Sequence, residues 1–177
     1  MKINIKDVIN NNYYIASKKI GGVLKVYAYM IEAHIVRKIG NEIEFLLLKR
    51  SDKDIYPGVW QMVTGSILSG EKAYEAVLRE IKEETGLAPD KLWVVPYMNS
   101  FYSRHRNHVC MVPVFTAIVD EKSEVVISDE HVEYKWVDKA TAIKSLAWIG
   151  QRNSVEVIYE YLTNEINVLN FEEIKIK

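Results

Sequence analysis

The chain contains one cysteine, Cys110, so it cannot form a disulfide bond within itself. Cys110 lies in the apolar stretch HVCMVPVF, and we expect a buried, inert thiol. The formal net charge is only -1 at pH 7, so no global basic field indicates nucleic acid as the main partner. The sequence has no run of about eighteen apolar residues, and its start lacks the apolar core of a signal peptide. These absences predict no membrane partner and a reducing, cytoplasmic setting.

Glycine and proline are also scarce, with 8 and 4 among 177 residues, whereas 49% of the residues are hydrophobic. This composition predicts one globular domain that is large enough to bury a core. The Asn-rich residues 1–22 end at Gly21-Gly22 and predict an N-terminal extension of uncertain structure. We expect the globular domain over residues 23–165 and a C-terminal tail over 166–177.

The pattern of β-branched, aromatic and apolar residues predicts strands over 23–36, 42–50, 59–67, 92–98, 108–119 and 132–138. Helical periodicity predicts helices over 71–85, 139–147 and 151–163. Many strands with few, irregularly placed helices indicate the α/β class, as a sandwich with helices on both faces of a sheet.

Three glutamates, Glu80, Glu83 and Glu84, lie within less than two turns of the helix predicted over 71–85. A solvated helix face is the usual meaning of such a run. Like charges at this spacing, however, cost about 0.2–0.5 kcal/mol per pair, and the helix C-terminus is the unfavourable end for negative charge. A bound divalent cation removes both objections. Oxygen ligands without nearby His or Cys suit Mg²⁺, with Mn²⁺ as an alternative.

The stretch from Gly65 to Leu87, GSILSGEKAYEAVLREIKEETGL, resembles a complete Nudix box. Gly65 is followed after five residues by Glu71 and after seven more by REIKEETGL, so every fixed position of that motif is filled. The resemblance implies a Nudix-type α/β/α sandwich with a mixed β-sheet and a catalytic loop–helix–loop. It also implies hydrolysis of a nucleoside diphosphate linked to another group.

The resemblance implies roles for individual residues of the box. Glu80, Glu83 and Glu84 would hold the metal, together with the backbone carbonyl of Gly65. Arg79 would orient a catalytic glutamate, and Glu71 would be mainly structural. The general base is not decided by the sequence, and the candidates within the box are Glu83 and Glu80.

Sequence outside the box resembles the bacterial dihydroneopterin triphosphate pyrophosphatases and their dNTP-hydrolysing relatives. The resemblance lies in WQMVTGS (60–66), SDEHVEYKWVD (128–138) and the Gln151-Arg152-Asn153 segment. It implies that Glu130 is a further metal ligand. An ordinary loop carboxylate is the alternative.

Two further segments supply candidates for substrate binding. Arg104 and Arg106 in FYSRHRNH could contact the terminal phosphates of a triphosphate, or they could lie in a solvated turn. Trp60 could stack on a base, although a strand tryptophan usually belongs to the core.

The sequence therefore predicts an enzyme that hydrolyses a small-molecule phosphoanhydride, a nucleoside or pterin triphosphate, and releases pyrophosphate. Hydrolysis of dinucleoside polyphosphates is the first alternative, and a nucleotide-sensing module without catalysis is the second. The intact box disfavours the second alternative. A homodimer is compatible with the sequence.

Overall fold

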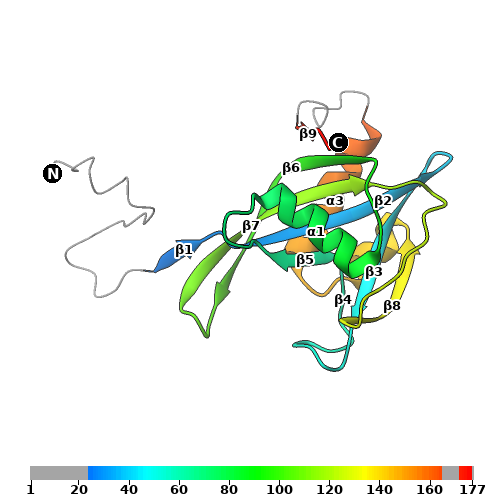
Figure 1. The fold of residues 1–177 in the computed structure, drawn as a ribbon. Helices are drawn as coiled ribbons and strands as arrows, with labels where there is room; N and C mark the ends of the chain where they lie inside the picture. The colour runs from blue at the N-terminus through cyan, green and yellow to red at the C-terminus, as the bar shows by residue number, and fades with distance from the viewer. Residues whose placement is uncertain (1–23, 165–171, 177) are drawn as a thin grey trace.

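The computed structural model describes residues 24–164 and 172–176, which form three helices and nine strands. The expected extension over 1–22 lies outside the described residues. One mixed sheet forms the middle layer, with one helix on its front face and two behind it (Figure 1). The expected α/β/α sandwich is therefore confirmed.

The hydrogen-bonded path through the sheet runs β4-β3-β2-β7-β6-β9, while β1 pairs with β7, β5 with β2 and β8 with β3. The strands are β1 (Lys25–Tyr27), β2 (Met30–Ile39), β3 (Glu42–Arg50), β4 (Trp60–Gln61), β5 (Val63–Ser66), β6 (Lys91–Ser103), β7 (His108–Ile118), β8 (His131–Val137) and β9 (Glu173–Ile174). The helices are α1 (Ala73–Thr85), α2 (Lys139–Ser145) and α3 (Ile149–Thr163). The central pair β2–β7 is parallel, which gives the sheet its mixed character.

Two strands that the sequence predicts as continuous are each divided in the structure. The stretch 23–36 is interrupted between β1 and β2, although both parts pair with β7. The stretch 59–67 is divided at the buried Met62, because β4 pairs with β3 whereas β5 pairs with β2. Each break marks a change of partner or register, which the local sequence does not encode.

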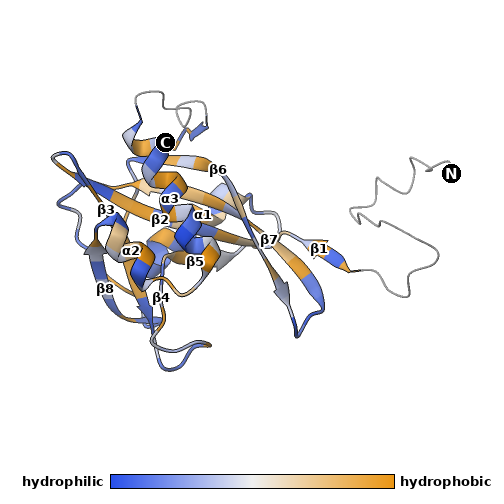
Figure 2. Cartoon of the chain, turned by 180° about the vertical axis from the view of Figure 1, so that it is seen from behind, coloured by the Kyte–Doolittle hydropathy of each residue, from blue (hydrophilic) through white to orange (hydrophobic). Residues whose placement is uncertain are grey.

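Each face of the sheet buries its own hydrophobic cluster, as period-two alternation along the strands requires. Ile31, Ala33 and Ile35 of β2 face α1. Val36 of β2 and Phe45 of β3 pack on the opposite side with residues of α2 and α3. Figure 2, seen from behind, shows hydrophobic segments along the central strands β2, β6 and β7. Any strand residue can therefore be assigned to the α1 face or the α3 face.

The last described residues also join the sheet. β9 lies within the expected C-terminal tail and pairs with β6 through Leu92 and Trp93. Ile174 and Ile176 pack against the cluster on the α1 face. Cys110 is fully buried, as predicted, and burial raises the pKa of its thiol. Within residues 24–164 and 172–176, every helix is too short or too polar to cross a membrane.

Candidate metal-binding active site

Helix α1 forms where the sequence predicts it. Near its N-terminus the Glu75 carboxylate accepts a hydrogen bond from the backbone N–H of Lys72 at 2.9 Å, which satisfies a donor that the helix itself leaves unpaired. At its C-terminus Gly86 adopts φ 69°, and its N–H bonds to the Lys82 carbonyl. Gly86 therefore caps the helix at its C-terminus, because the left-handed conformation favours glycine.

Arg79 lies at the centre of a network that organises the box. Its guanidinium donates to both oxygens of Glu71, at 2.9 and 3.0 Å, and to the Ser66 carbonyl at 2.9 Å. It also donates to Glu80 at 2.7 Å and to Glu83 at 3.1 Å. The hydrogen bonds from Arg79 hold the pKa of Glu71 below its usual range. Arg79 thus joins Glu71 to Glu80 and Glu83, while the structural role of Glu71 and the orienting role of Arg79 stay predictions.

Glu80 lies directly against the backbone of β5. A Cβ atom added to Gly65 would be 2.1 Å from the Cδ and Oε1 atoms of Glu80. Only a glycine therefore admits the Glu80 carboxylate at this place. Burial raises the pKa of Glu80, and Arg79 opposes that shift. The structure thus brings together the glycine at the start of the box and the first glutamate of its acidic run.

Glu84 differs from the solvated face that an acidic run normally forms, because it is 3% exposed. Its pKa is raised to about 9 by burial and, next, by the charges of Glu80 and Glu130. The backbone N–H of Thr64 and the charge of Arg50 act in the opposite direction. Glu83 points outward instead, with a side chain 59% exposed. Within the acidic run, Glu84 is therefore buried, Glu80 is partly buried and Glu83 is exposed.

The segment between β7 and β8 brings Glu130 to this site. Its residues Val126 and Ser128 donate backbone hydrogen bonds to the carbonyls of Thr85 and Glu84, at 2.9 and 3.1 Å. These bonds satisfy carbonyls that the end of α1 leaves unpaired. Because Glu130 follows two residues later, its charge raises the pKa of Glu80 and of Glu84. This electrostatic coupling supports the predicted placement of Glu130 beside the box.

Arg50 is a site residue that sequence reasoning missed. Its guanidinium donates to the Ile55 carbonyl at 2.7 Å and to the Gln61 side chain at 3.2 Å, and it pairs with Asp54 at 3.2 Å. These contacts fix the loop between β3 and β4 beside Glu84. Nothing in the local sequence KRSDKD distinguishes Arg50 from a surface cation, so only the fold reveals this role.

Several buried polar atoms around Glu84 have no hydrogen-bond partner among the described residues. They are Glu84 Oε2, Ser51 Oγ, Ser128 Oγ and both ring nitrogens of His131. His131 Nε2 lies 3.6 Å from Glu84 Oε2, which is too long for a hydrogen bond. Burial lowers the pKa of His131, so at neutral pH this contact is not an ion pair. Unpaired buried polar atoms are costly, and their concentration here points to a bound polar group or ion.

The donor set fits a hard divalent cation in its chemistry. Glu80, Glu83, Glu84, Glu130 and the Gly65 carbonyl offer only oxygen ligands. Across residues 24–164 and 172–176, however, no three carboxylate, imidazole or thiolate groups converge closely enough to hold an ion. Arg79 holds Glu80 and Glu83 in hydrogen bonds in this structure. Glu83 and Glu130 are exposed, whereas Glu84 is buried and Gly65 is partly buried.

The remaining sequence candidates lie away from these carboxylates. Arg104 and Arg106 belong to the turn between β6 and β7, at the end of a hairpin that projects away from α1 (Figure 1). Trp60 packs with the cluster on the α3 face, and Lys135 Nζ lies 4.2 Å from its ring centroid. One ring face of Trp60 is thus covered, and its stacking on a base remains a prediction.

A second buried polar cluster, on the α3 face, was also missed. Glu32 Oε1 lies 2.8 Å from His34 Nε2 and accepts from the Ser154 hydroxyl at 2.7 Å. Asn99 donates to the other carboxylate oxygen at 2.7 Å. Burial would raise the pKa of Glu32, but these partners together lower it. The only hint of this cluster in the sequence is the charged Glu32 inside the apolar run YMIEAHIV. Every oxygen of this carboxylate has a protein partner, which indicates that it joins β2, β6 and α3.

Comparison with known proteins identifies the family to which the chain belongs. The profile of the NUDIX domain matches residues 29–158. A nucleoside triphosphatase, NudI, from Escherichia coli is 30% identical over 107 residues, which cover 56% of this chain and 76% of NudI. An octanoyltransferase from Myxococcus xanthus is 32% identical over 124 residues, or 69% of this chain. The chain spans only 34% of the length of that protein.

Two solved structures resemble the fold closely. A Caenorhabditis elegans Ap4A hydrolase has a TM-score of 0.64 and 25% identity, covering 75% of this chain and 96% of that one. The E. coli dihydroneopterin triphosphate pyrophosphohydrolase has a TM-score of 0.62 and 28% identity, covering 76% and 99%. The fold and the box thus define a Nudix hydrolase. The chain belongs to the NUDIX family, and the family resemblance inferred from the box is confirmed.

Proposed function

We propose that the chain is a divalent-metal-dependent pyrophosphohydrolase of a nucleoside or pterin triphosphate. The observation that carries the proposal is the burial of Glu84, whose pKa is raised by the charges of Glu80 and Glu130. The Glu80 side chain itself lies against the backbone of Gly65. Burial raises the pKa of Glu80 and of Glu84, and the charge of Glu130 raises both further, so this arrangement has no structural benefit by itself. It becomes favourable when a cation neutralises the carboxylates.

The proposed ligands are Glu80, Glu83, Glu84, Glu130 and the Gly65 carbonyl, with Mg²⁺ or Mn²⁺ as the cation. A divalent cation would neutralise charge on the phosphates and lower the pKa of a water molecule. The chain's own residues then have two tasks, which are to hold the substrate in line with that water and to accept its proton.

Glu83 and Glu80 remain the candidates for the general base, with Arg79 as their positioning residue. Glu80 is held by Arg79 on one side and by the backbone at Gly65 on the other. Glu83 has one contact with Arg79 and is exposed. An exposed carboxylate moves more easily toward a substrate, so we favour Glu83 over Glu80 as the base.

The proposed products are the monophosphate and pyrophosphate. This choice is supported by the similarity to the E. coli dihydroneopterin triphosphate pyrophosphohydrolase. The similarity to the nucleoside triphosphatase NudI supports only a triphosphate substrate. Hydrogen bonds from Arg104 or Arg106 to the terminal phosphates would also have favoured cleavage between the α- and β-phosphates. Because the hairpin with Arg104 and Arg106 projects away from α1, that argument has no support, and the choice rests on the similarity to the pyrophosphohydrolase.

Hydrolysis of a dinucleoside polyphosphate is the second candidate. It is supported by the similarity to the C. elegans Ap4A hydrolase. The two candidates differ in their products. A triphosphate would give pyrophosphate, whereas diadenosine tetraphosphate would give two nucleotides.

The test is hydrolysis in ¹⁸O-labelled water with Mg²⁺, followed by mass spectrometry of the products. The panel contains the common nucleoside triphosphates, dihydroneopterin triphosphate and diadenosine tetraphosphate. We expect pyrophosphate from a triphosphate, with the label showing whether the α- or β-phosphorus was attacked. Orthophosphate as the first product, without contaminating pyrophosphatase, would overturn the proposed cleavage. Faster turnover of the tetraphosphate would select the second candidate.

A further inference from the structure

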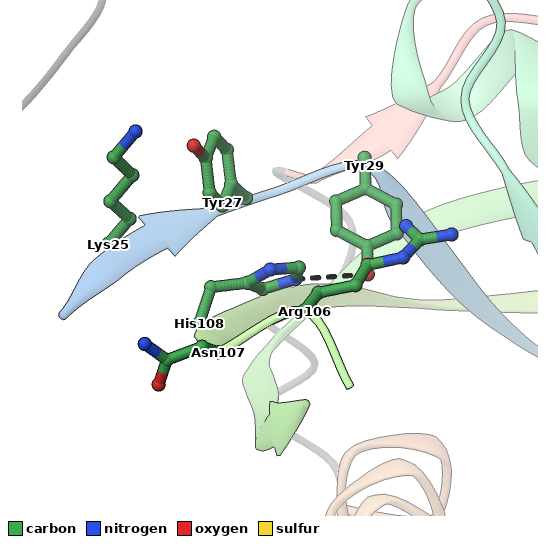
Figure 3. A pocket seen from close by; sticks show the side chains of 6 residues that line it. All are labelled: Lys25, Tyr27, Tyr29, Arg106, Asn107 and His108. Carbon is green, nitrogen blue, oxygen red and sulfur yellow. Dashed lines mark hydrogen bonds between the residues drawn. The ribbon is translucent and has the colours of Figure 1, made fainter. Parts of the chain in front are cut away.

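Strand β1 and the ends of β6 and β7 form an arm that projects beyond the body of the molecule (Figure 1). We define the arm as residues 24–29 and 97–113. A depression of about 480 Å³ lies on it. Figure 3 shows its lining: Lys25, Tyr27, Tyr29, Arg106, Asn107 and His108. This volume lies within the range of small-ligand pockets.

The depression lies on the opposite face of the sheet from α1. Asn99 bonds to Ser154 of α3 and therefore points to the α3 face. Phe101, two residues further along β6, points the same way, and its register partner on β7 is Cys110. On the other side of β7, Tyr27 of β1 pairs with Cys110 and therefore points to the α3 face as well. Lys25 and His108 pair with each other two residues away on each strand, so they point to the same face. The depression is thus separated from the α1 carboxylates by the sheet.

The arm is the cationic part of a chain whose net charge is -1. It carries Lys25, Arg104 and Arg106 and contains neither Asp nor Glu. Among residues 24–164 and 172–176, no carboxylate forms an ion pair with Lys25 or Arg106. Two exposed cations beside one depression, neither of them held in an ion pair among the described residues, attract an anion.

The aromatic wall of the depression is held in place by its own contacts. Tyr29 Oη and Nε2 of the nearly buried His108 lie 3.1 Å apart. The rings of Tyr27 and Tyr29 meet the His108 ring edge-on, with centroids 5.0 and 5.6 Å away. The Arg106 guanidinium lies 5.3 Å from the Tyr29 ring centroid, which limits its conformations. The depression therefore offers preorganised aromatic surface next to two cations.

We propose that this arm pocket binds a nucleotide, with Lys25 and Arg106 contacting its phosphates and Tyr27 contacting its base. Guanidinium and ammonium groups form strong hydrogen bonds to phosphate, and an aromatic ring packs on a planar base. The binding needs no divalent cation, since the pocket supplies its own positive charge. Arg106 thereby receives a role apart from the α1 carboxylates. The proposal does not rest on the hydrolase function proposed above.

The test is isothermal titration of the full chain with ATP in EDTA at low salt. Without divalent cations the α1 carboxylates repel a triphosphate, so binding under these conditions reports on the arm. We expect saturable binding that weakens with salt. The double variant Lys25→Ala/Arg106→Ala should bind at least about tenfold more weakly. Lys122→Ala, which removes an exposed cation outside the arm, is the matched control and should bind as the unchanged chain does.

Further ligands and variants separate the parts of the proposal. Adenosine should bind more weakly than ATP, and inorganic phosphate more weakly than AMP. Glu84→Gln should keep ATP binding in EDTA, so a loss of hydrolysis and a loss of arm binding are distinguishable. A 5′-phosphorylated oligonucleotide that binds more tightly than ATP would support the same chemistry with a nucleic-acid end as its source. No saturable binding of ATP in EDTA, or equal binding by the double variant and Lys122→Ala, would overturn the proposal.

Discussion

At the scale of single residues, two positions limit what the site can do. Gly65 admits the Glu80 carboxylate against the backbone of β5, and Glu84 places a carboxyl group where water has little access. The pattern of the box indicated both residues. It gave no sign that Glu84 is buried, since burial depends on the segment between β7 and β8 that covers the end of α1.

Gly65→Ala should displace the Glu80 carboxylate, because the new Cβ would lie 2.1 Å from its Cδ atom. We expect turnover to fall at least about tenfold, as misplacing a group at the site is costly, while the protein stays folded. The control is Gly40→Ala, at a turn with φ 60° and no atom within 4 Å of the new Cβ. That variant carries backbone strain but should keep its turnover. Equal effects of both variants on turnover would contradict the role of Gly65.

Glu84→Gln should raise the melting temperature in EDTA at pH 8. The pKa of Glu84 is about 9 in the folded chain against an ordinary 4.5, so the folded state retains a proton that the unfolded state releases. Stability linked to this group is full below about pH 4.5 and is lost as the pH rises toward 9. Glutamine cannot ionise and avoids this loss. The expected gain is at least about 3 °C at pH 8 and small at pH 5.

Glu83→Gln is the control for this measurement, because the Glu83 side chain is 59% exposed. It should change the melting temperature little at either pH. Added Mg²⁺ should stabilise the unchanged chain and reduce its difference from Glu84→Gln. A gain for Glu84→Gln that is the same at pH 5 and pH 8 would show that packing, not charge, is responsible.

At the scale of elements, the sequence predicted helices well and strand boundaries less well. The helix over 71–85 appears as Ala73–Thr85, because its residues favour helix and Gly86 ends it. The break at Met62 depends on which strand lies alongside, and the break at 28–29 accompanies a change of register with β7. Neither is encoded in the local sequence. The cluster around Glu32 joins β2, β6 and α3 across more than sixty positions of sequence, so no short window predicts it.

The segment between β7 and β8 gives a prediction at this scale, since it carries Glu130 to the end of α1. Glu130→Gln should lower turnover and raise the Mg²⁺ concentration needed for half-maximal activity, while Mn²⁺ binding by α1 persists in electron paramagnetic resonance. Asp129→Asn changes the adjacent exposed carboxylate and should leave both values unchanged. If Glu130→Gln and Asp129→Asn behave alike, Glu130 is an ordinary loop carboxylate.

At the scale of the whole molecule, the sheet separates two chemistries. The α1 face carries the carboxylates of the box, whereas the arm carries cations and aromatic rings facing the other side. The box predicted the first site because its residues are adjacent in sequence. The arm pocket combines residues 25–29 with 106–108, which only the parallel pairing of β1 with β7 brings together. Arg104 and Arg106 were therefore noticed in the sequence, but their surroundings were not predictable.

The central claim is that carboxylates of α1, with Glu84 at their centre, hold a divalent cation that hydrolysis requires. The most direct measurement is Mg²⁺-dependent turnover of the best triphosphate substrate by the unchanged chain and by Glu84→Gln, each with its melting temperature. We predict that the unchanged chain is inactive in EDTA and active with Mg²⁺, and that Glu84→Gln stays folded but loses at least about a hundredfold in turnover. Turnover in EDTA, or near-normal turnover by a folded Glu84→Gln variant, would contradict the account.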